Sequence, residues 1–81
     1  MPSTSVTVGS SVGLHARPAA LIAEAAGALG STVTINGVDA SSSLMIMTLG
    51  AKHGDSVEVA GDDQADVDSI AALVGQDLDA D

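Results

Sequence analysis

The stretch TVTINGV at residues 32–38 predicts a strand, a tight turn and the start of a second strand. Residues 32–35 alternate, with Val33 and Ile35 on one side, as in a strand that buries a single face. Asn36 and Gly37 form a pair that two-residue hairpin turns favour, because both residues tolerate a positive φ. A short strand at residues 38–41 then pairs with the first. The hairpin therefore indicates antiparallel neighbours.

Two elements are expected before this hairpin. Residues 4–8 alternate as a half-buried strand, and the Gly- and Ser-rich residues 9–13 are typical of a loop. The Ala-rich run at residues 16–26 predicts a helix. Pro18 is compatible with that helix because it falls in the first turn, and Gly27 and Gly30 end the pattern.

Three elements are expected after the hairpin. Ser42 or Ser43 can cap a short helix at residues 44–49, which Gly50 ends. Residues 56–60 alternate as another strand, and Gly61-Asp62-Asp63 supplies a turn and an N-cap for a last helix. The apolar stripe that this helix should bury consists of Val67, Ile70, Ala71, Val74 and Leu78.

The element order βαββαβα predicts an α+β fold. Its helices are too few and too unevenly placed for a doubly wound sheet, so we expect an open-faced sandwich. In this sandwich, three helices cover one face of a four-stranded antiparallel sheet. The 81 residues are expected to form a single domain with an aliphatic core, since 46% are hydrophobic and none is aromatic or Cys.

The charge balance limits the classes of partner. The chain has eleven acidic residues and only two basic ones, Arg17 and Lys52, which gives a net charge of −9. Such a surface repels nucleic acid and anionic membranes. No apolar run is long enough to span a bilayer, so we expect a cytoplasmic protein without membrane insertion. The composition is typical of proteins from halophiles, in which concentrated salt screens the repulsion between carboxylates. It is also compatible with an ordinary acidic domain.

The motif GLHARPA at residues 13–19 places His15 beside Arg17 where a loop enters a helix. A helix start offers free N–H groups and the positive end of the dipole, which would suit a phosphoryl group on the imidazole. The motif matches, without a mismatch, the active-site signature of the histidine-containing phosphocarrier (HPr) family of the sugar phosphotransferase system. The chain therefore resembles that family. A solvated surface histidine is the alternative.

The resemblance implies that Nδ1 of His15 accepts a phosphoryl group from phosphoenolpyruvate through enzyme I and passes it to a sugar-specific enzyme IIA. Arg17 would assist the transfer, and the N–H groups of Ala16 and Arg17 would bind the phosphoryl oxygens. We expect a carrier rather than a stand-alone catalyst, and no cofactor. His53 lies far along the chain and there is no Cys, which makes a metal site improbable on composition.

A second resemblance concerns the short apolar helix. In the family, a regulatory serine precedes a few apolar residues and Leu-Gly, and alignment on Leu49-Gly50 places Ser42 at that serine. A serine kinase would then act on Ser42, although the residue could serve only as a helix cap. Leu44 and Met47 suit a docking patch for partner proteins, with core packing as the alternative.

The chain also departs from the family pattern. Val12 stands where many relatives have a polar side chain, and Glu24 and Met45 replace positive charge that relatives present to acidic partners. Two other roles remain open from the sequence. One is a regulatory relative that signals through Ser42 or the phosphorylated state of His15. The other is a carrier for a dihydroxyacetone kinase system.

Overall fold

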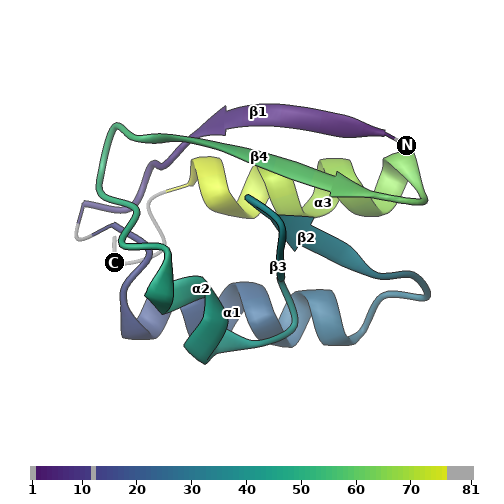
Figure 1. Cartoon of the computed structure of the whole chain (residues 1–81), viewed down its shortest axis with the longest axis horizontal. Coiled ribbons are helices and arrows are strands. Elements are labelled where there is room, and N and C mark those ends of the chain that lie inside the picture. Colours follow the sequence, from purple (N-terminus) through teal and green to yellow (C-terminus); the bar gives the residue numbers. More distant parts are fainter. Residues whose placement is uncertain (1, 12, 77–81) are drawn as a thin grey trace.

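The computed structural model describes residues 2–11 and 13–76, which form a four-stranded sheet and three helices (Figure 1). In chain order the elements are β1 (Ser3–Thr7), α1 (Ala16–Gly27), β2 (Val33–Ile35), β3 (Val38–Asp39), α2 (Ser43–Thr48), β4 (Ser56–Gly61) and α3 (Gln64–Gly75). The strands lie in the order β1-β4-β2-β3, and each neighbouring pair is antiparallel. The α+β sandwich predicted from the sequence is confirmed.

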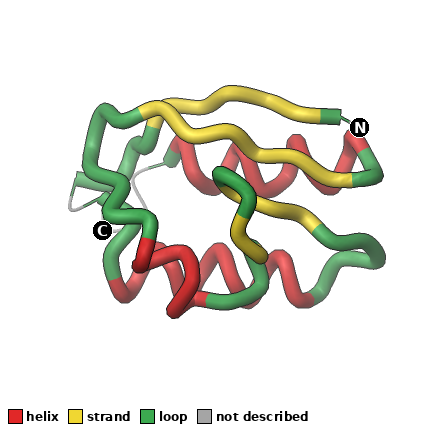
Figure 2. Tube along the Cα trace, in the orientation of Figure 1, coloured by secondary structure: helices red, strands yellow, loops and turns green. Residues whose placement is uncertain are grey.

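All three helices lie on one face of the sheet, and the core fills the space between the two layers (Figure 2). The largest fully buried side chains are aliphatic, and they come from both layers: Ile22, Ile35, Ile46, Ile70, Val59, Val67 and Val74. Apolar side chains alternate with exposed ones along β4, as a strand that buries a single face requires. The core therefore forms without aromatic residues.

The predicted hairpin joins β2 and β3. Asn36 and Gly37 have φ values of 49° and 85°, as a two-residue turn with both positions left-handed requires. Asn36 also fixes the hairpin to β4, because its backbone N–H donates to the carbonyl of Glu58 and its side-chain Oδ1 accepts the N–H of Glu58, each at 2.8 Å. One residue thus closes the turn and sets the register of the neighbouring strand.

The strand predicted at residues 38–41 is shorter in the structure and ends at Asp39. The carboxylate of Asp39 accepts hydrogen bonds from the backbone N–H and the hydroxyl of Ser41, at 2.9 and 2.7 Å. The N–H of Ser42 donates to the carbonyl of Asp39. These bonds form a turn of the kind that Asp side chains favour, so the chain leaves the sheet before Ser41.

The helix ends differ slightly from those predicted. Helix α1 includes Gly27, and α2 begins and ends one residue earlier than expected. Asp63 caps α3 by accepting the N–H of Ala65 at 2.9 Å, and the predicted stripe on α3 is buried as far as Val74. Leu78 lies outside the described residues. None of the described helices has the length and hydropathy needed to cross a bilayer.

Candidate functional site

The loop after β1 and the loop before β4 lie side by side at one end of the molecule (Figure 1). The N–H of Leu14 donates to the carbonyl of Ala51 at 3.0 Å, and the side chain of Leu14 is only 3% exposed. Gly13 has a φ of +76°, and a Cβ there would lie 2.9 Å from the Cα of Lys52. Glycine therefore allows the two backbones to meet. These contacts hold the next residue, His15, beside the second loop.

His15 is the N-cap of α1 and has an extended backbone, with φ −88° and ψ −165°. Its side chain is exposed, and its Nδ1 accepts the N–H of Ala16 at 3.0 Å. An imidazole nitrogen that accepts a hydrogen bond carries a lone pair, so the ring proton of the neutral form is on Nε2. The structure thus places a nucleophilic nitrogen at the surface, directly at the start of a helix.

The first turn of α1 has few backbone donors left for an anion. Pro18 has no N–H, and the N–H of Ala19 already donates to the carbonyl of His15 at 2.9 Å. The N–H of Ala16 donates to the ring, and the N–H of Arg17 forms no hydrogen bond with another described residue. The N–H groups that the sequence predicts for phosphoryl binding are thus the two at the start of α1, of which that of Ala16 contacts Nδ1 of His15.

A hollow of about 370 Å³ adjoins the imidazole. Its walls are formed by residues of the two site loops and of α2: Leu14, His15, Met47, Gly50, Ala51 and Lys52. His15 and Lys52 are its titratable residues, and the other walls are uncharged. Ser42 and Leu44 are not among the residues that line it. The structure therefore brings Met47 to the predicted site directly, and the other two α2 residues only through their helix.

Both basic side chains of the protein lie at this end of the molecule. Arg17 is exposed on the first turn of α1, and Lys52 is exposed in the loop that packs against Gly13. Neither forms an ion pair with a carboxylate of the described residues. Lys52 is not predicted to belong to the site from the sequence alone, because no motif surrounds it. Its only signal was its rarity, as one of two cations in an acidic chain.

Helix α2 presents residues of three kinds. Ser42 is its N-cap, and its hydroxyl accepts the N–H of Met45 at 3.3 Å, so the predicted capping role is confirmed. Leu44 is 67% exposed, whereas Met47 is half-buried and packs against the core. Core packing, the alternative to a docking role, therefore accounts for part of the Met47 side chain but not for Leu44.

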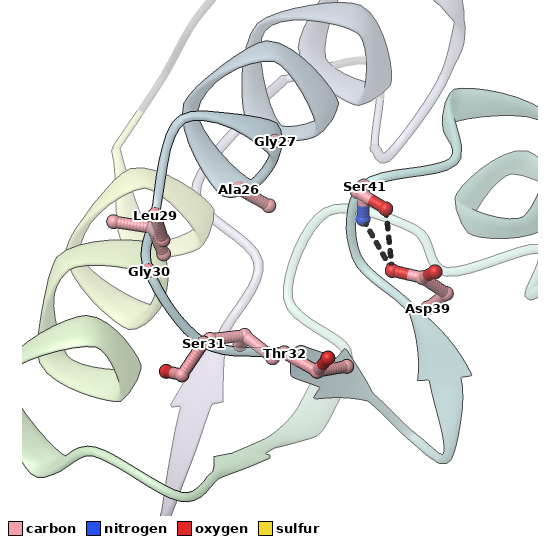
Figure 3. Close-up of a pocket in the computed structure, with 9 residues that line it drawn as sticks. Ala26, Gly27, Leu29, Gly30, Ser31, Thr32, Asp39 and Ser41 are labelled. Atoms are coloured by element: carbon pink, nitrogen blue, oxygen red, sulfur yellow. Dashed lines mark hydrogen bonds between the residues drawn. The ribbon is translucent and has the colours of Figure 1, made fainter.

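A second hollow, of about 260 Å³, lies at the opposite end of α1 and contains none of the predicted site residues (Figure 3). Gly27 and the loop that follows α1 line one side, and Asp39 and Ser41 line the other. The hydroxyl of Ser41, and then its backbone N–H, hold the pKa of Asp39 below the ordinary value of 3.8. Both of these hydrogen bonds are made to Oδ1 of Asp39.

The remaining residues singled out from the sequence are easily placed. His53 is exposed in the loop after Lys52 and is not among the residues that line the hollow beside His15. Glu24 is exposed on α1, and Met45 is exposed on α2. Val12 lies outside the described residues.

Comparison with known proteins gives concordant matches. The family model described as the phosphorylation site of the PTS HPr component matches residues 2–76. A phosphocarrier protein HPr of Streptomyces coelicolor is 38% identical over 87 aligned positions, which cover 98% of this chain and 94% of the relative. The crystal structure of HPr-C-His from Thermoanaerobacter tengcongensis superposes with a TM-score of 0.87 at 25% identity, covering 100% of this chain and 99% of that one. HPr of Bacillus anthracis gives 0.83 at 28% identity, over 90% of this chain and 95% of that chain.

Proposed function

Because this chain belongs to the HPr family, the phosphocarriers of the phosphotransferase system, we propose that His15 carries the phosphoryl group and that Arg17 assists its transfer. The observation that carries the proposal is the exposed imidazole at the start of α1. Its Nδ1 already touches the N–H of Ala16, and the N–H of Arg17 is the next donor along the chain. An anion on Nδ1 would meet both donors and the positive end of the helix dipole.

Enzyme I first takes a phosphoryl group from phosphoenolpyruvate. Loading of the carrier begins when the Nδ1 lone pair of His15 attacks the phosphorus of that group. A nitrogen–phosphorus bond forms, the bond between phosphorus and the donor breaks, and the electron pair of that bond leaves with the donor. Negative charge in the transition state spreads over the equatorial oxygens. The N–H of Ala16 then turns from the ring nitrogen to a phosphoryl oxygen, and Arg17 supplies positive charge.

Discharge is the reverse of loading. A nucleophile of enzyme IIA attacks the phosphorus, the nitrogen–phosphorus bond breaks, and its electron pair returns to Nδ1 of His15. The N–H of Ala16 can then donate to the ring again, at the 3.0 Å distance seen in the structure. The same donor stabilises the ring in one state and the phosphoryl group in the other. The backbone N–H of Ala16 therefore has an acceptor both before and after transfer.

Donor and acceptor must dock on the same surface in turn, since there is one phosphoryl site. We assign this docking surface to Leu44 and Met47 of α2, because Leu44 is exposed and Met47 lines the hollow next to His15. Phosphorylation of Ser42 by a serine kinase would place an anion at the same face and repel a phosphorylated partner. Phosphoenolpyruvate arises in the cytoplasm, so we place the carrier there.

The proposal is tested by incubating the protein with phosphoenolpyruvate and enzyme I and measuring its intact mass. We expect a gain of one phosphoryl group that is labile in acid and stable in alkali, as a nitrogen–phosphorus bond requires. An HPr already known to be a substrate of the same enzyme I serves as the positive control. If that control is phosphorylated and this protein is not, the proposed function is wrong.

A further inference from the structure

We propose that Lys52 is a second cationic positioning residue of the phosphoryl site, which holds the phosphoryl group on His15 from the side opposite the start of α1. This inference rests on the proposed function of His15 and adds a residue to it. The motif at residues 13–19 contains no part of the loop that carries Lys52.

The first support is position. Lys52 and His15 line the same hollow, and the backbone of Lys52 abuts Gly13, only two residues before the imidazole. The loop is held in place, because the N–H of Lys52 donates to Oδ2 of Asp55 and the N–H of Asp55 donates to the carbonyl of Lys52, both at 2.9 Å. The base of the lysine side chain therefore has a fixed place beside the hollow, while its length leaves the ammonium free to reach into it.

The second support is charge. Against 11 acidic residues, the chain has Arg17 and Lys52 as its cations, and the ammonium of Lys52 forms no ion pair with a described carboxylate. The nearest acidic residue along the chain, Asp55, bonds to the backbone of Lys52 instead. A lysine on so acidic a surface has many possible carboxylate partners, yet Lys52 borders the hollow that His15 also lines. An arriving phosphoryl group would be the anion that fits this cation.

The third support is the nature of the walls. The remaining walls are uncharged and largely apolar, so they offer no charge that competes with Lys52; they are formed by Leu14, Met47, Gly50 and Ala51. Interactions between charges are stronger where water is displaced, as it would be when a partner covers the hollow. The ammonium of Lys52 should thus stabilise the phosphoryl oxygens most during transfer, when the hollow is closed.

The test uses the full chain with two variants of Lys52 and one control. Lys52→Met removes the charge but keeps a long side chain, and Lys52→Arg keeps the charge. Ser69→Glu, on an exposed position in the middle of α3, lowers the net charge by the same one unit away from the site. For each protein, kcat and KM for phosphorylation by enzyme I are measured, together with the ³¹P resonance and hydrolysis rate of the isolated phosphoprotein.

We expect Lys52→Met to lower kcat about tenfold, less than the loss of a buried, preorganised donor would. It should also shift the ³¹P resonance and change the hydrolysis rate, whereas Lys52→Arg should recover most of the kcat and Ser69→Glu should match the parent. The proposal is overturned if Lys52→Met keeps the parental kcat and ³¹P resonance, or if only KM rises, which would make Lys52 a docking residue. If enzyme I does not phosphorylate the parent protein, the proposed function is wrong, and the inference about Lys52 is wrong as well.

Discussion

At its first turn, helix α1 borders a hollow that His15 and Lys52 line, and at its last turn the same helix borders another, lined in part by Gly27, Asp39 and Ser41 (Figure 3). The two hollows differ in size by less than a factor of two, at about 370 and 260 Å³. They differ more in chemistry. The first combines an exposed imidazole, the basic side chain of Lys52 and the positive end of a helix dipole, whereas the second combines a hydrogen-bonded carboxylate and the negative end.

Both ends of α1 border a hollow, so concave shape alone does not distinguish the end that we propose to be functional. The carboxylate of Asp39 accepts two hydrogen bonds from Ser41, both on Oδ1, and it belongs to no cluster of basic or nucleophilic side chains in this hollow. At the other end, Arg17 and Lys52 form no ion pair with a described carboxylate, and Nδ1 of His15 accepts a hydrogen bond from the N–H of Ala16 at 3.0 Å. Basic side chains without an ion-pair partner among the described residues, together with an exposed imidazole, distinguish the end that we propose to be reactive.

The largest effect is expected from His15→Ala, which removes the nucleophile from the first hollow. Phosphorylation by enzyme I should fall to background, while the melting temperature should change little because the side chain is exposed. His53→Ala is the matched control and should be phosphorylated like the parent. Full phosphorylation of the His15→Ala variant, measured by intact mass, would place the carrier site elsewhere.

Arg17→Ala should slow phosphoryl exchange on the order of a hundredfold, because a preorganised cation next to the transferred group is lost. The melting temperature should stay close to that of the parent, since Arg17 is exposed. Arg17→Lys should restore part of the rate, as it returns the charge without the planar fork. An exchange rate in Arg17→Ala equal to that of the parent would remove this residue from the site.

Changes on α2 should reduce transfer about tenfold, because they act on docking rather than on the reacting atoms. Ser42→Asp should slow phosphorylation of His15 while it keeps or raises the melting temperature, since an anion is favourable near a helix start. Leu44→Ala and Met47→Ala should raise KM for enzyme I. If all three variants are phosphorylated at the parental rate, the shared docking surface is wrong.

Ser42→Ala tests the cap alone. The variant loses the hydroxyl that accepts the N–H of Met45, so the free energy of unfolding should fall by about 1 kcal/mol. Phosphoryl transfer should be nearly unchanged. Urea unfolding and a phosphorylation assay on the same preparation separate the two readouts.

Salt should act on the acidic surface as a whole. With a net charge of −9, the protein should have a higher melting temperature in molar potassium chloride than in dilute buffer, because screening weakens the repulsion among carboxylates. Asp77, Asp79 and Asp81 would add to that repulsion but lie outside the described residues. A melting temperature that stays flat or falls with added salt would argue against halophilic adaptation.

The smallest effect is expected at the second hollow, where the bonds from Ser41 lower the pKa of Asp39. A lowered pKa in the folded state means that the carboxylate stabilises the fold above its ordinary pKa of 3.8, and that this contribution disappears as the pH falls through the lowered value. The Ser41→Ala variant should therefore be slightly less stable than the parent at neutral pH. Its free energy of unfolding should fall less than that of the parent when the pH is lowered. Urea unfolding at neutral and acidic pH should show the two proteins converging in acid.

The sequence predicted the sheet and its hairpin because the relevant signals are local. Asn36 and Gly37 determine the turn through their own φ preferences, and Val33 and Ile35 determine the buried face through alternation. The early end of β3 was missed because it depends on a side-chain hydrogen bond from Ser41 to Asp39, which competes with strand pairing.

The same distinction applies to the site. His15, Ala16 and Arg17 are consecutive, so the motif and the helix start could be identified together from the sequence. Lys52 could not be identified, since it reaches the site through contacts of Gly13 and Leu14 with a loop far along the chain. Only the folded structure brings these loops together.

The most direct measurement of the central claim follows one phosphoryl group onto His15 and off again. The protein is phosphorylated by enzyme I, freed from phosphoenolpyruvate and mixed with an enzyme IIA, and both proteins are weighed by mass spectrometry over time. We predict that the mass of one phosphoryl group leaves the carrier as it appears on enzyme IIA, and that no such transfer occurs with His15→Ala. Phosphoryl release as inorganic phosphate, or transfer that persists without His15, would contradict the account.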